Sequence, residues 1–265
     1  MEDPDLIPRD NLQLGVCVAY EIPHQEVTPD FTDCLKSAVQ HISDLTVSLP
    51  TGVFGFFNAS VASPFLEHFS FRLVNQLFFV FIEDYEQQLR TPTQIEQTLF
   101  AADLANGIPC VLTMRKTVDG WVPAREGWGL VDVETRQPIS PPSLTSTEQI
   151  EISDWELQGF AVQVVKAHLE KSVKGVLSTN SNPDVTPSIF AVSEDHTPFF
   201  VQVSAARHPH VPEVDLSDMQ KLKHRLSEHA EKGYVALVSV LGANSDLLFR
   251  GEPYRVKFDG LQEIF

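Results

Sequence analysis

The sequence predicts a mixed α/β fold of the α+β kind, made of two similar units in tandem. The apolar run Phe78–Ile82 in the first half has a counterpart, Phe199–Val203, 121 positions later. Each run is followed by a helix-like stretch, a glycine and a second apolar run, and these glycines, Gly107 and Gly233, are 126 positions apart. Such self-similarity indicates a repeated unit. We expect each unit to have the order helix, three strands, helix, two strands.

The first unit is expected within residues 1–140. After a polar arm over residues 1–10, the β-branched residues of segment 12–22 favour a strand. A helix begins at Thr28-Pro29-Asp30, because the threonine can cap it, the proline suits the first turn and the aspartate favours the positive end of the helix dipole. A strand-like region over residues 45–57 follows, with an interruption at Pro50-Thr51-Gly52.

Turn signals place the later elements of this unit. A hairpin is predicted over residues 68–74 and 77–83. Thr91-Pro92-Thr93 is expected to cap a helix that ends at Asn106-Gly107, with the glycine in the left-handed conformation. Two strands and a linker rich in Pro, Ser and Thr follow, at residues 108–115, 121–133 and 137–149.

The second unit is expected within residues 150–265. Ser153 and Glu156 form a capping-box pattern at the start of its first helix. Its second helix starts at Asp215 or Ser217 and stops at Gly233. The strands are expected at about 173–178, 187–193, 198–205, 234–241 and 253–258. The nearly continuous apolar runs around Phe79 and Phe200 are typical of strands buried on both faces, so we expect them at the centres of their sheets.

The charge balance limits the partners. The chain has 36 acidic and 19 basic side chains, a formal net charge of −17. Such an excess repels phosphates, so we expect neither nucleic acid nor a membrane as partner. Cys17, Cys34 and Cys110 lie in apolar settings without metal-type spacing, and the first residues are acidic where a secretion signal is basic and then apolar. We therefore expect a cytoplasmic protein with reduced, buried thiols.

Four positions of the second half carry a resemblance to a known family. Pro187-Ser188 precedes a predicted strand, Gln202-Val203-Ser204 lies in the next one, and Glu156 lies on the helix before them. Over residues 150–260 this arrangement resembles the PD-(D/E)XK, or restriction-endonuclease-like, fold. That family has Pro-Asp before or in the second strand and Glu-x-Lys or Gln-x-Lys in the third. The resemblance implies that Glu156, Ser188, Gln202 and Ser204 stand where a nuclease has its active site.

The same resemblance implies that the nuclease chemistry is absent. In the family, acids hold a divalent cation, and the lysine orients the attacking water or stabilises charge. Ser188 has no carboxylate, Ser204 no amine and Gln202 no charge, whereas magnesium needs carboxylate ligands. We expect no catalytic residue, no cofactor and no metal at these degenerate positions. Two alternatives stay open: an ordinary α+β domain without nuclease ancestry, and the acidic secretion-chaperone-like fold, which has the same element order and binds proteins.

Weaker candidates for a metal or an acid–base pair lie in both halves. Glu83 and Asp84 follow the central strand of the first unit, and paired carboxylates can bind metal or transfer protons. An acidic loop after a strand is, however, more often a solvated turn. His208 and His210 can chelate a transition metal, but no third ligand is near in sequence, which favours a surface loop.

A repeated arginine indicates a structural contact. Arg125 and Arg250 are 125 positions apart, and Arg250 occupies the matching place before the last strand of the second unit. We expect each to anchor the closing strand of its unit by hydrogen bonds to carbonyls or to a carboxylate. Trp128, close to Arg125, is a further structural or binding candidate.

The function class that these observations favour is non-catalytic. We expect a protein-binding or regulatory module that takes part in assembly, with another protein as its partner. A homodimer is the second kind of association left open. The competing class is a metal-dependent nuclease or other hydrolase that uses an unconventional acidic site.

Overall fold

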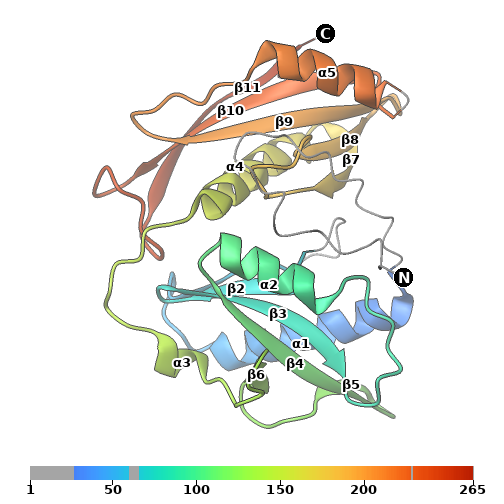
Figure 1. The fold of residues 1–265 in the computed structure, drawn as a ribbon, viewed down its shortest axis with the longest axis vertical. Helices are drawn as coiled ribbons and strands as arrows, with labels where there is room; N and C mark the ends of the chain where they lie inside the picture. Colours follow the sequence, from blue (N-terminus) through green and yellow to red (C-terminus); the bar gives the residue numbers. More distant parts are fainter. Residues whose placement is uncertain (1–26, 60–65, 228, 265) are drawn as a thin grey trace, which may run out of the picture.

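The computed structural model describes residues 27–59, 66–227 and 229–264. The polar arm over residues 1–10, the strand over 12–22 and Cys17 lie outside these residues. The described chain forms two units, each a mixed sheet with helices packed against its faces, and Figure 1 shows one unit stacked on the other. The predicted fold class, α+β with two tandem similar units, is confirmed.

The first unit contains two helices on its sheet. The elements are α1 (Pro29–Thr46), β1 (Phe54–Asn58), β2 (Phe69–Leu73), β3 (Gln76–Asp84), α2 (Ile95–Leu104), β4 (Ile108–Thr117), β5 (Gly120–Pro123) and β6 (Leu130–Asp132). As expected, Thr28 caps α1: its side chain accepts a hydrogen bond from the amide of Phe31 at 3.1 Å.

The second unit follows a short helix, α3 (Pro141–Leu144), in the connecting segment. Its elements are α4 (Asp154–Leu169), β7 (Val173–Thr179), β8 (Ile189–Ser193), β9 (Pro198–Arg207), α5 (Leu216–Leu226), β10 (Lys232–Gly242) and β11 (Tyr254–Glu263). The predicted capping box is present, because the Ser153 side chain accepts from the Glu156 amide and the Glu156 carboxylate accepts from the Ser153 amide.

Five strands of each sheet follow the same order. These orders are β1-β2-β3-β4-β5 and β7-β8-β9-β10-β11, and the first sheet has a sixth strand, β6, which pairs with β4. In each, the middle strand pairs antiparallel with the strand before it and parallel with the strand after the second helix. The middle strands β3 and β9 contain Phe79 and Phe200, as the apolar runs predict.

The side chains of the two middle strands alternate between helices in the same way. Phe78 packs in the cluster with α1, whereas Phe79 packs in the cluster with α2. Val201 packs in the cluster with α4, whereas Phe200 packs with α5. Alternation of side chains across a strand explains this division. Phe79 and Phe200 therefore occupy corresponding faces of the two sheets.

Some element boundaries differ from the sequence-based expectation. The region over residues 45–57 is a strand only from Phe54, because α1 continues to Thr46. The single strand expected at 121–133 is divided into β5 and β6, which both pair with β4. The chain leaves the sheet between them and turns through Gly127 and Gly129, which have φ of 67° and 69°.

The ends of α2 also differ from the prediction. Its N-cap is Gln94, whose amide donates to the side chain of Gln97 at 3.0 Å, and not a residue of Thr91-Pro92-Thr93. At the other end, the left-handed residue is Asn106, with φ of 48°, and not Gly107. A Cβ on Gly107 would lie 2.5 Å from the Phe79 ring, so this glycine is required for close packing and not for its backbone angle.

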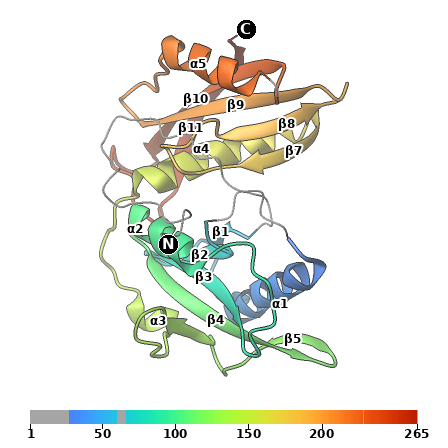
Figure 2. The ribbon, with the colours of Figure 1, turned by 45° about the vertical axis from the view of Figure 1, so that its right-hand side comes forward.

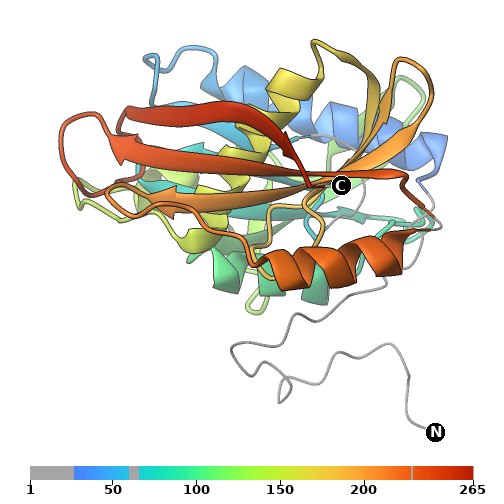
Figure 3. The ribbon, with the colours of Figure 1, turned by 90° about the horizontal axis from the view of Figure 1, so that it is seen from above.

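Helix α4 lies between the two sheets. One side of α4 packs on the sheet of its own unit, and its first turns also contact the first unit (Figure 2). Its counterpart α1 packs against a single sheet. Seen from above, the long strands β10 and β11 (red in Figure 3) cross over the first unit. Within the described residues, no helix is long and apolar enough to cross a membrane.

Candidate functional site at the junction of the two units

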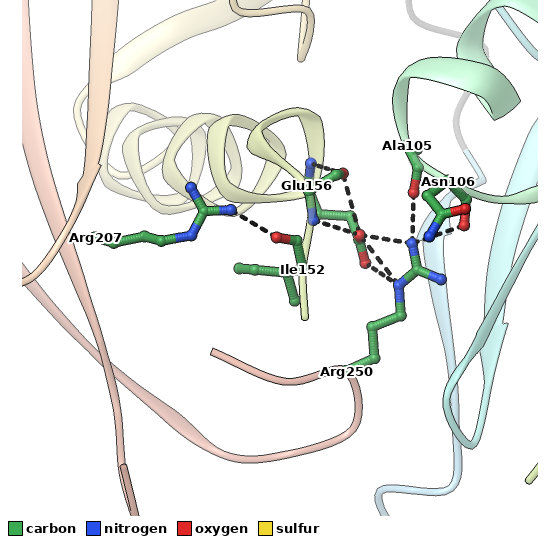
Figure 4. Close-up of polar contacts among 7 residues, drawn as sticks. Ala105, Asn106, Ile152, Glu156, Arg207 and Arg250 are labelled. Carbon is green, nitrogen blue, oxygen red and sulfur yellow. Dashed lines mark hydrogen bonds and ion pairs between the residues drawn. The ribbon is translucent and has the colours of Figure 1, made fainter. Parts of the chain in front are cut away.

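A buried ion pair lies where the units meet. Arg250 is in the loop between β10 and β11, and Glu156 is in the first turn of α4. The Nε of Arg250 lies 2.9 Å and 3.1 Å from the two oxygens of Glu156, and its Nη2 lies 2.8 Å from Oε2 (Figure 4). The exposed fractions of the two side chains are 0% and 2%. Because both charges are removed from water, loss of either residue would leave the other as an uncompensated buried charge.

Arg250 also binds the other unit. Its Nη2 donates to the carbonyls of Ala105 and Asn106, at the C-terminal end of α2 (Figure 4). These carbonyls have no partner inside the helix, and a cation there complements the negative end of the helix dipole. The carboxylate of Glu156 lies in the first turn of α4, where a negative charge complements the positive end of the helix dipole. The pair thus joins the end of one helix to the start of another.

The start of α4 is fixed by a second arginine. Arg207, at the end of β9, donates from Nη2 to the carbonyl of Ile152 at 2.6 Å (Figure 4). Its Nη1 donates to Asp154. The segment before α4 also pairs with the loop that carries Arg250: the Ile152 amide donates to Leu248 and the Arg250 amide to Ile150, both at 2.9 Å. The position of Glu156 relative to Arg250 is therefore set by backbone contacts as well as by the ion pair.

Aromatic rings fill the space beside the ion pair. Trp155 of α4 inserts into the apolar cluster of the first unit, with its ring centroid 5.1 Å from that of Phe57 and 5.2 Å from that of Phe79. Phe160, one turn later, lies 5.6 Å from Phe57. Gly159 faces the same ring, and a Cβ there would lie 2.5 Å from Cζ of Phe57. The junction is thus close-packed around Phe57.

A cavity of about 550 Å³ adjoins this junction. The first unit contributes Gly55, Phe56, Phe57 and Arg72 to its wall, and the second unit contributes the aromatic rings Phe160, Phe249 and Tyr254. The rings of Phe160 and Tyr254 stack with centroids 4.8 Å apart. Glu156 and Arg250 line it as well. A concave, mostly apolar space with a few polar groups is the usual form of a binding site.

Arg72 is the second arginine of the cavity wall. It lies in β2 opposite Gly55 of β1, and its guanidinium donates to the carbonyls of Gly52, Val53 and Val74. Burial lowers the pKa of Arg72, and the negative charge of Glu156 counteracts this effect. Within the described part of the chain, no carboxylate forms an ion pair with Arg72. Its charge is therefore solvated mainly by carbonyl dipoles.

The four nuclease-like positions are only partly brought together. Ser188 and Gln202 lie next to each other on neighbouring strands, and the Ser188 Oγ accepts from the amide of Val203 at 3.2 Å. Gln158 of α4 donates to this Oγ and to the Val203 carbonyl, at 3.3 Å and 2.9 Å. Glu156 is directed instead to Arg250. Ser204 donates to the carbonyl of Glu213 at 2.8 Å. The group of Ser188, Gln202 and Gln158 is a neutral, buried network that bonds mainly to backbone.

The acidic and histidine candidates lie apart from the junction. Glu83 pairs with Arg136 at 2.7 Å. Asp84 accepts from the amides of Glu86, Gln88 and Leu89 and so closes the loop after β3. His208 and His210 are exposed in a turn after β9. In the described residues, no three His, Cys, Asp or Glu side chains are grouped as metal ligands would be.

The two matched arginines have different surroundings. Arg250 is buried at the junction, whereas Arg125 is exposed in the turn between β5 and β6. Trp128 is half-buried, and its ring stacks on Phe71 with centroids 6.2 Å apart. Cys34 and Cys110 are free and buried, and burial raises the pKa of both thiols, that of Cys34 to about 12.

Sequence reasoning did not identify Arg72, Phe57 or Trp155 as site residues. Arg72 and Phe57 lie in strands, and Trp155 lies in a helix. The sequence around them does not distinguish residues that line a cavity from ordinary surface or core residues. The one available signal was the end of α2 at Asn106-Gly107, since exposed helix carbonyls attract a cation.

The comparisons with known proteins bear on the second unit. A family model described as a domain of unknown function (DUF8840) matches residues 155–264. These residues run from the first turn of α4 to just after β11. No curated protein and no solved structure matches the chain.

Proposed function

We propose that the chain is a non-catalytic protein-binding module, and that it holds a segment of its partner in the junction cavity. The observation that carries the proposal is the cavity itself, because its aromatic walls come from both units. Aromatic residues and arginine are the side chains that contribute most to protein–protein binding. A segment seated there would contact both units at once.

The charge and the thiols support the finer parts of the proposal. A formal net charge of −17 disfavours nucleic acid and anionic membranes as partners. The buried, free thiols of Cys34 and Cys110 suit a reducing compartment and support a cytoplasmic location as part of the proposal. A metal-dependent hydrolase is the less favoured function, because the side chains of Ser188, Gln202 and Ser204 supply no carboxylate for a cation.

Selection from a random peptide library tests the proposal. Peptides retained by the natural protein would be measured for affinity against a variant whose cavity is filled. Gly55→Leu is suited to this, because a Cβ at Gly55 meets no atom within 4 Å. Gly175→Leu is the matched control: Gly175 lies in the corresponding edge strand β7 and also has open space around it.

We expect Gly55→Leu to weaken peptide binding about tenfold or more, since the added side chain occupies the apolar space. Gly175→Leu should leave the affinity unchanged. Equal binding to the natural protein and to Gly55→Leu would show that the peptides bind elsewhere. A selection that returns no binding peptide would contradict protein binding.

A further inference from the structure

We infer that the junction cavity recognises a carboxylate carried by an apolar peptide segment, with Arg72 and Arg250 receiving the carboxylate and the aromatic rings receiving the apolar part. The inference specifies the ligand of the proposed protein-binding function and rests on that function. It depends on a buried N–H group of Arg250 that has no partner among the described residues, and on the absence there of a carboxylate paired with Arg72.

Arg250 has a buried donor without a partner. Its Nη1 is shielded from solvent and makes no hydrogen bond to any described residue, although Nε and Nη2 are both bonded. Figure 4 shows Nη1 directed away from Glu156, on the side of the first unit. Buried N–H groups of a cation are nearly always bonded, so an unbonded one in a residue that lines a cavity indicates a missing acceptor.

Arg72 lies close to the loop that carries Arg250. Gly251, the neighbour of Arg250, is so near that a Cβ on it would lie 3.2 Å from Nη1 of Arg72. Both arginines line the cavity. Each guanidinium presents a planar fork of N–H groups, and such forks match the two oxygens of a carboxylate.

The acidic residues of the cavity wall do not accept a hydrogen bond from Nη1 of Arg250. Both oxygens of Glu156 are already bonded, to Arg250 and to the amide and hydroxyl of Ser153. Glu252, at the rim, accepts from the side chain of Gln149 at 2.9 Å. A ligand carboxylate would thus add an acceptor for Nη1 of Arg250 and an anionic partner for Arg72. In a partly desolvated space, this contact is stronger than the same contact in water.

The apolar walls select what carries the carboxylate. Phe57 on one side, and Phe160, Phe249 and Tyr254 on the other, contribute aromatic residues to the wall. A small hydrated anion would leave this surface uncovered. An aromatic or aliphatic group next to the carboxylate would cover it and gain by burial.

The test uses a minimal probe and its neutral analogue. Binding of 3-phenylpropionate, 3-phenylpropionamide and inorganic phosphate would be followed by chemical-shift titration of the natural protein. We expect saturable binding of 3-phenylpropionate with shifts at cavity residues, and no saturation with the amide or with phosphate. Equal binding of acid and amide, or displacement of the acid by equimolar phosphate, would overturn the inference.

Variants locate the site. Arg72→Gln should weaken 3-phenylpropionate binding about tenfold or more, because a charge-assisted contact is lost. Arg255→Gln, at an exposed position on β11, is the matched control and should have no effect. Since Arg72 also holds the loop at Gly52, Gly55→Leu provides a second variant that leaves the arginine in place and should abolish binding by occlusion. Unchanged binding in both cavity variants would refute the site.

The peptides from the library selection separate this inference from the proposed function. Each peptide would be compared with a free and an amidated C-terminus and with its acidic residues replaced by amides, which tells a terminal from a side-chain carboxylate. Peptide binding that survives all these changes and Arg72→Gln would leave protein binding standing and overturn the carboxylate inference. If 3-phenylpropionate binds but the selection returns no binding peptide, the carboxylate site would stand and protein binding would be contradicted.

Discussion

At the scale of single residues, Arg250 has the largest role in the junction. It neutralises Glu156 and binds the last carbonyls of α2 in the other unit. Lysine has one point charge where arginine has a planar fork, so it cannot make these contacts together. Arg250 was expected to anchor the last strand of its own unit by hydrogen bonds to carbonyls or to a carboxylate, and the carbonyls that it binds belong to the opposite unit.

Replacing Arg250 tests its role in stability. Arg250→Met leaves Glu156 buried without a counter-charge, and we expect the free energy of unfolding to fall by about 3–5 kcal/mol. Urea denaturation followed by circular dichroism measures this loss. Arg255→Met is the control on the exposed strand β11 and should change stability by less than about 0.5 kcal/mol. Similar values for the two variants would show that the junction pair adds little.

Two adjacent buried groups, Glu67 and His68, respond to pH in opposite directions. Burial lowers the pKa of His68 from 6.5 to about 3, and its Nδ1 accepts from the amide of Ile82 at 2.8 Å. Burial raises the pKa of Glu67 above its ordinary value of 4.5. Because His68 stays neutral when folded but binds a proton when unfolded, it contributes stability above pH 6.5 that is lost as the pH falls toward 3. Glu67 makes the folded state gain stability as the pH falls toward 4.5.

We therefore expect His68→Asn to remove part of the acid sensitivity. Asn can still accept from the Ile82 amide but does not titrate. Between pH 7 and pH 5, the natural protein should lose about 2 kcal/mol more stability than this variant. Denaturation at both pH values measures the difference, and Glu67 cancels because it is common to both proteins. His224→Asn, at an exposed position of α5, should keep the natural slope. The same slope in His68→Asn would refute the assignment.

At the scale of elements, the most informative comparison is between α1 and α4. The two helices hold the same place in their units, but α4 is buried on two sides. In its first turns Trp155, Glu156, Leu157, Gln158 and Gly159 are all buried. An amphipathic pattern describes contact with one sheet only, so a helix that touches two sheets lacks a clear polar stripe.

Gly159 is where α4 approaches the first unit most closely. Gly159→Ala should destabilise the protein by about 1–3 kcal/mol through overlap with the Phe57 ring, despite the gain of up to about 1 kcal/mol in helix propensity. The ring has little room to move, because Trp155 and Phe160 pack against it. Chemical denaturation measures the change.

A double-mutant cycle provides the control for Gly159. Phe57→Leu removes the ring atoms that the new methyl group would meet, so the alanine should be less harmful, or stabilising, in that background. If Gly159→Ala is equally destabilising with and without the Phe57 ring, its cost does not arise at this contact.

An element could be predicted from the sequence where the residues that determine it lie close together in the chain. The capping of α1 and α4 and the central strands β3 and β9 could be predicted, because their signals lie within a few residues. The division of β5 from β6 could not, since it depends on pairing of both with β4. The role of Gly107 was also hidden, because the Phe79 ring that excludes a side chain there comes from another strand.

At the scale of the whole molecule, the units are joined by more than a linker. Arg250 and the aromatic contacts connect them directly, and Asn75 in the β2–β3 turn fixes the linker itself by donating to the carbonyl of Glu148 at 2.9 Å. The candidate site could not be predicted, because its residues are far apart in sequence and act only together. Arg250 and Asn106, for example, are separated by 144 positions.

We expect the two units to unfold together. Native-state hydrogen exchange should give the same opening free energy for amides in β3 and β9, the centres of the two sheets. Arg250→Met should then lower protection in both strands by equal amounts, because it weakens a contact that they share. Loss of protection in β9 alone would show that the first unit is stable by itself.

The long separation of Arg250 from its partners has a consequence during synthesis. The ribosome completes the first unit and α4 well before Arg250 is added to the chain, and domains usually fold as they emerge. Until then, the Glu156 carboxylate and the last carbonyls of α2 lack Arg250, and the Phe160 ring lacks Tyr254, which stacks on it in the finished protein. A growing chain therefore exposes a charged, aromatic surface that chaperones can recognise, and the loop between β10 and β11 closes it near the end of translation.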